Sequence, residues 1–130
     1  MKPVRVLAGV ELGMHLSDLL ALDGFLLDES AAHEVEGYQS VTRRSPRTTV
    51  SVVDGQVCSV SVIDEFYRGP TNVIGKPFDD VALLLGGVDR VLRRESSALV
   101  EFLMRDGFRV DVLDGEVIVV GIEDFSHVKD

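Results

Sequence analysis

The hairpin sequence VSVVDGQVCSVSV, residues 50–62, decides the fold, because it alternates valine with small residues on both sides of an Asp-Gly pair. The same pattern returns sixty residues later as VDVLDGEVIVVGI, residues 110–122. Alternation with a period of two is typical of a strand with one buried face. The sequence therefore predicts two β-hairpins of the same kind.

The loop length of each hairpin follows from the side chains that must share a face. The valines before the first turn share a face with Cys58 and the later valines only if the loop has an odd number of residues. A three-residue loop, Val53–Gly55, with its glycine in the left-handed conformation meets that condition. The same reasoning predicts a Leu113–Gly115 loop, which aligns the apolar residues Phe108, Val110, Val112, Ile118, Val120 and Ile122.

A second pair of matching segments precedes the hairpins. They read LGMHLSDLLALDG at residues 12–24 and IGKPFDDVALLLG at residues 74–86. Proline has a backbone angle suited to a helix start, and acids are favoured in the first turn by the helix dipole. Each segment therefore predicts a short helix closed by glycine. We interpret the chain as a duplicated unit, with pseudo-repeats at approximately 4–66 and 67–126.

Residues 89–105 carry a longer helical pattern, with an apolar stripe at Val91, Leu92, Leu99, Phe102 and Leu103. Short helices are marginal in water, so we expect them to pack against a sheet. The expected fold class is α+β, with two helix-plus-hairpin repeats forming one antiparallel sheet and the helices packed on one face. No stretch is typical of a domain linker, so residues 1–130 are expected to form a single domain.

Residues 25–48 are less regular. The segment Phe25–Leu27 is compatible with a strand, residues 29–36 with a helical turn that ends at Gly37, and residues 38–42 with an extended segment.

Composition limits the function. The chain has 130 residues and a formal net charge of -9, and most of the excess acids lie in residues 1–40 and 106–130. This charge disfavours nucleic acid as a partner, since the phosphate backbone is itself negative. No run approaches the ~20 apolar residues of a membrane span, and the N-terminus does not resemble a signal peptide. We expect a cytoplasmic protein with no membrane partner.

No pattern favours catalysis. A nucleophile and base could come from Cys58 and one of three histidines, His15, His33 and His127. The hairpin pattern, however, predicts that Cys58 lies on the buried face as an inert thiol. The histidines lack the spacing of a zinc motif, and no glycine-rich phosphate loop is present in the sequence. We expect neither an enzyme nor a bound metal or cofactor.

One short stretch runs against the acidic charge. Arg43, Arg44 and Arg47 fall within five residues just before the first hairpin. They are interpreted as a basic loop, either solvated or in contact with a phosphate or an acidic partner.

The repeated unit of an aliphatic-Gly pair, an acid, an apolar run, a closing glycine and a hairpin resembles the helix-plus-sheet repeat of the BamE/SmpA-like superfamily. The resemblance covers about residues 9–24, 50–62, 74–87 and 107–122. That repeat occurs in tandem in beta-lactamase-inhibitory-protein-like chains, and similar small domains are found among bacterial immunity proteins. The resemblance implies a sheet surface that binds proteins.

The leading functional hypothesis is a protein-binding inhibitor, most specifically an immunity protein that neutralises a bacterial toxin domain by covering its active site. A toxin with a basic, nuclease-like groove would attract an acidic inhibitor. The candidate partner-binding residues are exposed acids and possible aromatic anchors. They are Glu29, Glu34, Glu36, Tyr38, Phe66, Tyr67, Asp111, Glu116, Glu123 and Asp124.

Two alternatives stay open. The first is a small-ligand-binding domain or enzyme with a pocket between the helices and the sheet. The second is a subunit that self-associates through a sheet edge, so that the protein is a monomer or a weak homodimer.

Overall fold

The computed structural model describes residues 4–29 and 37–124. Their elements, in chain order, are β1 (Val6–Leu7), β2 (Val10–Glu11), α1 (Leu16–Leu20), β3 (Leu26–Leu27), β4 (Tyr38–Arg44), β5 (Arg47–Val53), β6 (Gln56–Val62), β7 (Tyr67–Arg68), β8 (Thr71–Asn72), α2 (Phe78–Val81), the 3-10 helix η1 (Ala82–Leu85), β9 (Val88–Arg94), β10 (Leu99–Met104), β11 (Arg109–Leu113) and β12 (Glu116–Glu123).

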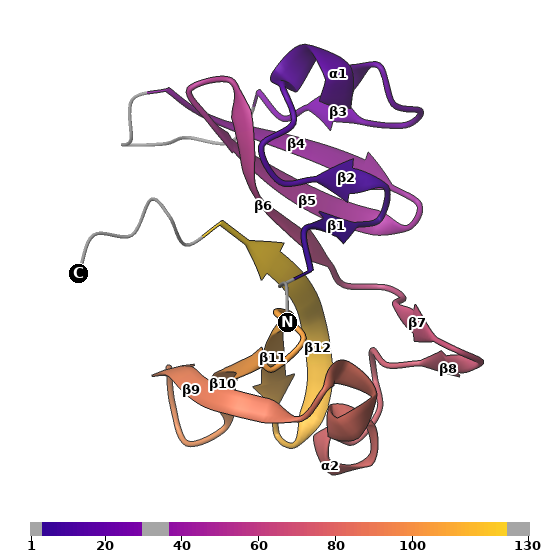
Figure 1. Cartoon of the computed structure of the whole chain (residues 1–130), viewed down its shortest axis with the longest axis vertical. Helices are drawn as coiled ribbons and strands as arrows, with labels where there is room; N and C mark the ends of the chain where they lie inside the picture. The colour runs from indigo at the N-terminus through magenta and orange to yellow at the C-terminus, as the bar shows by residue number, and fades with distance from the viewer. Residues whose placement is uncertain (1–3, 30–36, 125–130) are drawn as a thin grey trace.

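An eight-stranded antiparallel sheet dominates the structure (Figure 1). Its strand order is β3-β4-β5-β6-β12-β11-β10-β9, so each half of the chain contributes four neighbouring strands. Strands β6 and β12 meet at the centre of the sheet, and β3 and β9 form its two edges. Two small hairpins, β1-β2 and β7-β8, stand before the helices in the two halves.

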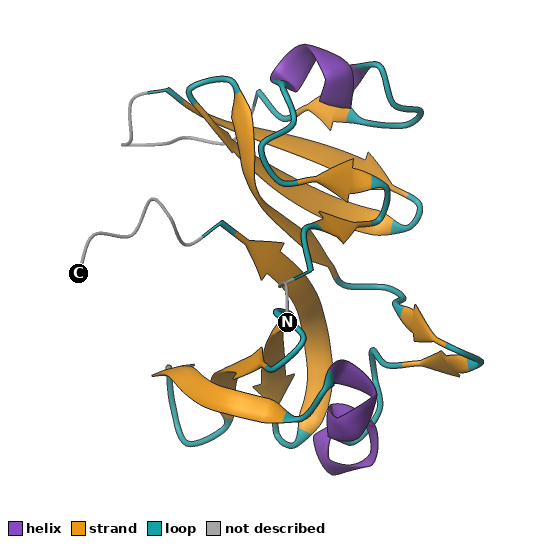
Figure 2. Ribbon diagram, viewed as in Figure 1, coloured by secondary structure: helices purple, strands orange, loops and turns teal. Residues whose placement is uncertain are grey.

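The expected α+β class is wrong. Strands account for 52% of the structure and helices for 11% (Figure 2). Helix α1 has five residues, and α2 has four before the chain tightens into η1. A glycine with a φ of 86° at position 86 ends the second helical segment, because glycine adopts the left-handed cap without strain. Such short helices cannot form a layer over an eight-stranded sheet.

The helix expected over residues 89–105 is also wrong. These residues form β9 and β10, joined by a turn that Ser96 stabilises. The Ser96 hydroxyl oxygen accepts hydrogen bonds from the backbone N–H groups of Ala98 at 3.2 Å and Leu99 at 3.1 Å. Serine at this spacing competes with the helical backbone for its donors. Pairing of β10 with the alternating strand β11 then overrides the helical stripe.

The predicted three-residue loops are two-residue turns. Val53 pairs with Gln56, and Asp54 and Gly55 between them have φ values of 52° and 79°. Positive φ at both central residues is the requirement for a type I′ turn. The second hairpin repeats this geometry at Asp114 and Gly115, with φ values of 50° and 82°.

A β-bulge, rather than the loop, brings the apolar residues to one face. The register shifts between Ser51 and Val52 in the first hairpin and between Asp111 and Val112 in the second. The extra residue on the returning strand reverses which side chains point inward. As a result Val57 and Val117 are buried, while Cys58 and Ile118 are only partly buried. The prediction that Cys58 and Ile118 share the core face is therefore wrong.

The two halves place equivalent residues in equivalent contacts. Each helix is tied to its hairpin by two backbone hydrogen bonds of 2.8 Å: Gly13 N to Val57 O and Leu16 N to Gly55 O in the first half, Gly75 N to Val117 O and Phe78 N to Gly115 O in the second. These pairs are related by the same offsets as the sequence matches. The two segments that are similar in sequence therefore form the same hydrogen bonds to the hairpin of their own half.

The halves join through a self-complementary strand pair. Ser61 faces Gly121, Val60 faces Ile122 and Val62 faces Val120. Exchanging the halves by the sixty-residue offset leaves these pairings unchanged. Such a register is the one expected of a two-fold-related interface.

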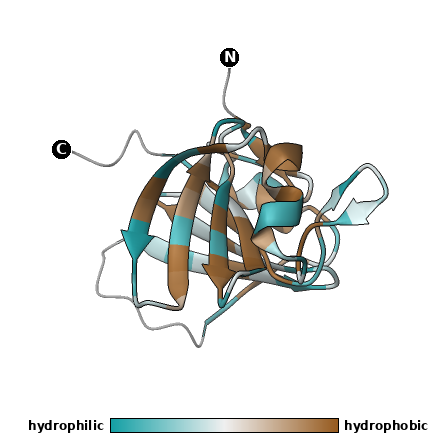
Figure 3. Ribbon diagram, turned by 90° about the horizontal axis from the view of Figure 1, so that it is seen from below, coloured by the Kyte–Doolittle hydropathy of each residue, from teal (hydrophilic) through white to brown (hydrophobic). Residues whose placement is uncertain are grey.

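One face of the sheet holds the core. Hydrophobic and polar residues alternate along its strands (Figure 3), and the apolar set is buried together with side chains from the helices and small hairpins. The fully or nearly fully buried members include Val10, Leu19, Val41, Val50, Val52, Val57, Val60, Val62, Val73, Val81, Leu85, Met104, Phe108, Val110, Val117, Val120 and Ile122. We call the opposite side of the sheet the polar face.

Residues 25–48 follow the expectation in part. Leu26 and Leu27 form the edge strand β3, and the extended segment is the longer strand β4, Tyr38–Arg44. Arg43 and Arg44 therefore lie in a strand rather than in a loop. The helical turn expected over residues 29–36 falls almost wholly outside the described residues.

Candidate functional site

An arginine surrounded by carboxylates occupies the polar face of the second half. Arg109 on β11 is only 16% exposed, and its guanidinium lies 3.1 Å from Glu123, 3.6 Å from Glu101 and 3.6 Å from Asp111. The same guanidinium donates a hydrogen bond of 2.8 Å to the Ser61 hydroxyl across the central seam. We call Arg109 with these three acids the Arg109 cluster.

Cross-strand pairing builds this cluster. Glu101 on β10 faces Asp111 on β11, and Arg93 on β9 faces Glu101 on its other side. Arg93 donates to Glu101 at 3.0 Å and also pairs with Glu95. Opposite charges on neighbouring strands stabilise a sheet, so four strands are linked by a continuous row of charge pairs.

Burial raises the pKa of the Asp111 carboxyl above its usual range, and the nearby Glu101 charge raises it further, while Arg109 acts in the opposite direction. Asp111 Oδ1 is also buried without a hydrogen bond. Asp111 and Glu123 were both predicted to meet a partner. The structure instead places both carboxylates within ion-pair distance of the Arg109 guanidinium.

The predicted aromatic anchors are not on one surface. Tyr38 is half-buried, and its hydroxyl lies 2.7 Å from the Ser51 hydroxyl. Phe66 packs against Phe108 with a 5.1 Å centroid distance and belongs to the margin of the core. Tyr67 on the β7-β8 hairpin is 56% exposed. Of the three, Tyr67 is best placed to contact another molecule.

The remaining predicted acids are scattered. Glu29 is exposed at the end of the first described range, and Glu116 is exposed at the start of β12. Asp124 lies just beyond β12 and is partly buried. Glu34 and Glu36 lie outside the described residues. Of the predicted residues that the structure describes, Tyr38, Glu123 and Asp124 line one hollow beside Cys58, but the set as a whole does not converge on one patch.

The thiol of Cys58 does not have the surroundings of a nucleophile. It donates a hydrogen bond of 3.3 Å to the backbone oxygen of Ser51. Burial raises the pKa of this thiol, and the charge of Glu123 raises it further, so the reactive thiolate is disfavoured. His15 is exposed at the start of α1, whereas His33 and His127 lie outside the described residues. No group of three or more His, Cys, Asp or Glu suited to a metal ion occurs among residues 4–29 and 37–124.

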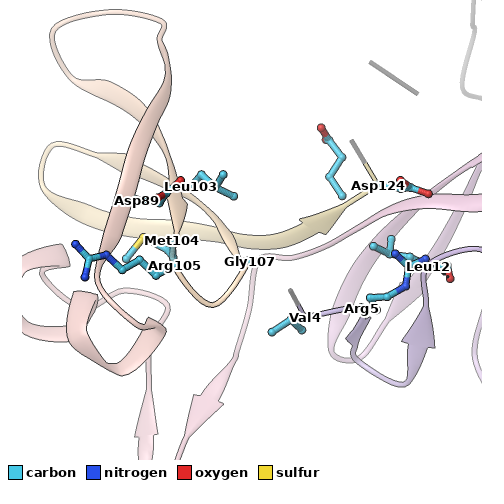
Figure 4. Close-up of a pocket in the computed structure, with 10 residues that line it drawn as sticks. Val4, Arg5, Leu12, Asp89, Leu103, Met104, Arg105, Gly107 and Asp124 are labelled. Carbon is cyan, nitrogen blue, oxygen red and sulfur yellow. Dashed lines mark hydrogen bonds between the residues drawn. The ribbon is translucent and has the colours of Figure 1, made fainter. Parts of the chain in front are cut away.

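A hollow of about 390 Å³ lies between the two halves near the end of β12 (Figure 4). Arg5 and Leu12 line it from the first half, and Leu103, Met104 and Arg105 from the second. Glu123 and Asp124 also line it. The mixture of cations, anions and apolar atoms does not favour one class of ligand.

A second hollow, also about 390 Å³, lies between α2 and strands β10 and β11. Its floor is apolar, with the Phe78 ring stacked on Phe102 at a centroid distance of 4.5 Å and an interplanar angle of 13°. Asp79 and Asp114 stand among the residues that line it. We call this site the acidic hollow.

The fold, and not the sequence, brings the two acids of this hollow together. Asp79 lies in the first turn of α2, and Asp114 lies in the β11-β12 turn. The hydrogen bond from Phe78 N to Gly115 O joins the helix start to that turn, and Pro77 bridges to Glu116 beside it. The only sequence signal was the paired offset of the helix and hairpin matches, which indicated that these segments recur as one unit.

No helix within the described ranges is both long and apolar enough to cross a membrane. Comparison of the chain with known protein families, with curated proteins and with solved structures finds no match in any of the three. The resemblance to the BamE/SmpA-like repeat stays a prediction.

Proposed function

We propose that this chain is a protein-binding inhibitor, most specifically a cytoplasmic immunity protein that neutralises a bacterial toxin domain by covering its active site. The observation that carries the proposal is the acidic hollow, where two carboxylates border a floor of stacked aromatic rings. The net charge of -9 also supports a basic partner.

The hollow suits an arginine or lysine side chain of the partner. The aliphatic stem of such a residue packs on apolar surface while its charged end stays near polar groups. Here the stem would lie on Phe78 and Phe102, and the cation would meet Asp79 and Asp114. An aromatic-lined pocket that receives an arginine is a common centre of binding energy at protein interfaces.

The surrounding charge would speed recognition of a basic groove. Asp79, Asp80, Asp114 and Glu116 are all exposed at the α2 end of the molecule, and none has an ion-pair partner among the described residues. Complementary fields raise association rates and disfavour wrong partners. Glu116, one of the predicted binding residues, belongs to this end.

The backbone around the hollow is already ordered. Its walls come from α2, the β9-β10 turn and the β11-β12 turn, which hydrogen bonds tie to one another or to the sheet. A site that needs no reordering loses less free energy on binding. This arrangement favours a rigid docking surface.

The test is a binding titration of the full chain against the protein encoded by the neighbouring gene, with an activity assay of that protein. We expect a complex and loss of the partner's toxic activity. The double variant Asp79→Asn with Asp114→Asn should weaken binding about tenfold or more, the size expected for a charged pair at an interface.

The chain contains its own control. Asp18 and Asp54 stand at the helix start and hairpin turn of the first half, so Asp18→Asn with Asp54→Asn changes the same charge on the same scaffold. This control should bind as the wild type does. Equal weakening by both double variants would show that overall charge, and not the acidic hollow, drives binding, while absence of any complex would remove the inhibitor proposal.

The hollow also favours one alternative, a domain that binds a small organic cation. Its position between α2 and the sheet matches the pocket that this alternative requires. Titration with a quaternary ammonium probe separates the two functions. Saturable binding that depends on Phe102, without any protein complex, would favour the ligand-binding domain.

A further inference from the structure

Two arginines face each other at the end of the β4-β5 hairpin. Arg44 and Arg47 are directly paired across the strands, and both are exposed. Like charges placed opposite each other destabilise a strand pair. In the described ranges, no carboxylate forms an ion pair with either guanidinium, although the chain contains 22 acids. Their charge is therefore left unbalanced in an acidic protein.

A hollow of about 490 Å³ adjoins these arginines. Thr42 faces Thr49 two residues further along the same strands, and side chains two apart on a strand point to the same face. Arg44, Arg47 and both threonines therefore share the polar face and line the hollow with Ile63. Neither threonine hydroxyl forms a hydrogen bond to another described residue, so both are available to a ligand.

Arg43 and Thr48 also line the hollow, but they alternate with the residues above and so belong to the core side of their strands. The Arg43 guanidinium donates to Ala8 O and Thr48 Oγ1, each at 3.3 Å, and lies 4.5 Å from the centre of the Phe25 ring. These contacts hold it on the core side of the strand. Asp64 accepts a hydrogen bond of 3.1 Å from the backbone N–H of Arg47, which fixes the turn and leaves the Arg47 guanidinium outside ion-pair distance.

We propose that this hollow binds the phosphoryl group of a small molecule, held between the guanidinium groups of Arg44 and Arg47 with Thr42 and Thr49 as hydroxyl donors. The proposal goes beyond inhibition of a partner protein, because the site has the opposite charge from the acidic hollow and lies in the other half of the chain.

The donor set favours a phosphoryl group over a carboxylate. Two guanidinium groups offer paired N–H donors in a planar fork that matches phosphate oxygens, and two hydroxyls add further donors. A phosphoryl group supplies three oxygens and close to two negative charges near neutral pH. A carboxylate supplies two oxygens and one charge, so it leaves part of the cation pair unbalanced.

The test is a titration of the full chain with inorganic phosphate, glycerol 3-phosphate and acetate at constant ionic strength, followed through the backbone amide resonances of residues 42–49. We expect saturable shifts with both phosphate probes and at least tenfold weaker binding of acetate. Glycerol 3-phosphate should bind no more weakly than phosphate, because the hollow has room beyond one phosphoryl group. Exclusion of the ester would overturn the assignment to a small molecule.

Matched variants locate the site. Arg44→Gln with Arg47→Gln should weaken phosphate binding at least tenfold, since charge-assisted hydrogen bonds are lost. Arg90→Gln with Arg94→Gln on the exposed edge strand β9 removes the same charge and should leave binding unchanged. Equal weakening by both pairs, or shifts that do not saturate in the wild type, would overturn the proposal.

Thermal melting distinguishes loss of phosphate binding from a folding defect. Without phosphate, the Arg44→Gln, Arg47→Gln protein should melt no lower than the wild type, because a repulsive pair is removed. Phosphate should raise the melting temperature of the wild type and not of this variant. An equal rise in both proteins would place the binding site elsewhere.

Discussion

The two halves share a scaffold and differ in what they place on the polar face. In the first half, Ser40 on β4 faces Ser51 on β5. At the corresponding positions of the second half, Glu101 faces Asp111. Arg109 likewise stands where the first half has Thr49. The same backbone register thus carries hydroxyl groups in one half and interlocked charges in the other, which shows that the hydrogen-bond pattern does not depend on this set of side chains.

Replacing Arg109 with threonine, its counterpart in the first half, should give the largest effect. The change leaves Glu101, Asp111 and Glu123 without their shared cation. Removing one partner of a poorly exposed ion pair costs about 3 kcal/mol. Urea unfolding at pH 7 should show this loss in the free energy of unfolding.

A triple variant sharpens that result. Adding Glu101→Ser and Asp111→Ser to Arg109→Thr copies the first half at three positions. This protein should recover more than half of the lost stability, because the unpaired acids are also removed. If the triple variant is no more stable than Arg109→Thr alone, the scaffold of the second half depends on its charges.

The central seam offers the next test. A Cβ at Gly121 would lie 3.0 Å from the backbone oxygen of Val60 and 3.0 Å from the Arg109 guanidinium. Gly121→Val should therefore cost about 2 kcal/mol through overpacking. Ser61→Ala, at the equivalent position of the first half, removes one hydrogen bond and should cost about 1 kcal/mol. Thermal unfolding of both variants measures the difference.

The hairpin turns should respond alike in the two halves. Gly55 and Gly115 have φ values of 79° and 82°, and nothing lies within 4 Å of a Cβ built on either. The cost of Gly→Ala is thus backbone strain alone, about 1 kcal/mol at each site. Chemical denaturation should give equal losses, and a clear inequality would contradict the structural equivalence of the turns.

The smallest effect should be the pH dependence that Asp111 contributes. Its pKa is raised in the folded protein, so the folded state holds this proton more tightly than the unfolded chain. Stability from this group is therefore greatest below the unfolded pKa, about 3.9, and declines as pH rises through the folded pKa. The stability of the wild type relative to Asp111→Asn should fall as pH rises from 3.5 to 6, by about 1 kcal/mol or less.

The turn positions were predictable because their cause is local. Asp-Gly between alternating valines indicates a hairpin, and both hairpins form where that pair stands. The bulges were not predictable, since they depend on which of two neighbouring residues, Val57 or Cys58, packs better in the core. Alternation alone does not distinguish a longer loop from an extra residue in the strand.

The error over residues 89–105 has a different origin. Val91, Leu92, Leu99 and Phe102 fit a helical stripe and a pair of strands almost equally well. These residues form strands because Ser96 stabilises a turn between them and because β11, an adjacent strand with a stronger alternating pattern, pairs with β10. The acidic hollow was missed for a related reason, because its two carboxylates meet only after the helix start and the β11-β12 turn have docked.

The self-complementary pairing of β6 with β12 also concerns the covalent continuity of the chain. Residues 63–66 link the halves, while the seam itself is held by ladder hydrogen bonds and by Arg109 reaching Ser61. The backbone N–H of Val4, in the first half, also donates a 3.0 Å hydrogen bond to the backbone oxygen of Asp106 in the second half. The two halves are therefore in contact at a second place. The linker therefore acts chiefly by raising the local concentration of one half around the other, and two separately synthesised fragments divided at this linker should reassemble into the native sheet when mixed.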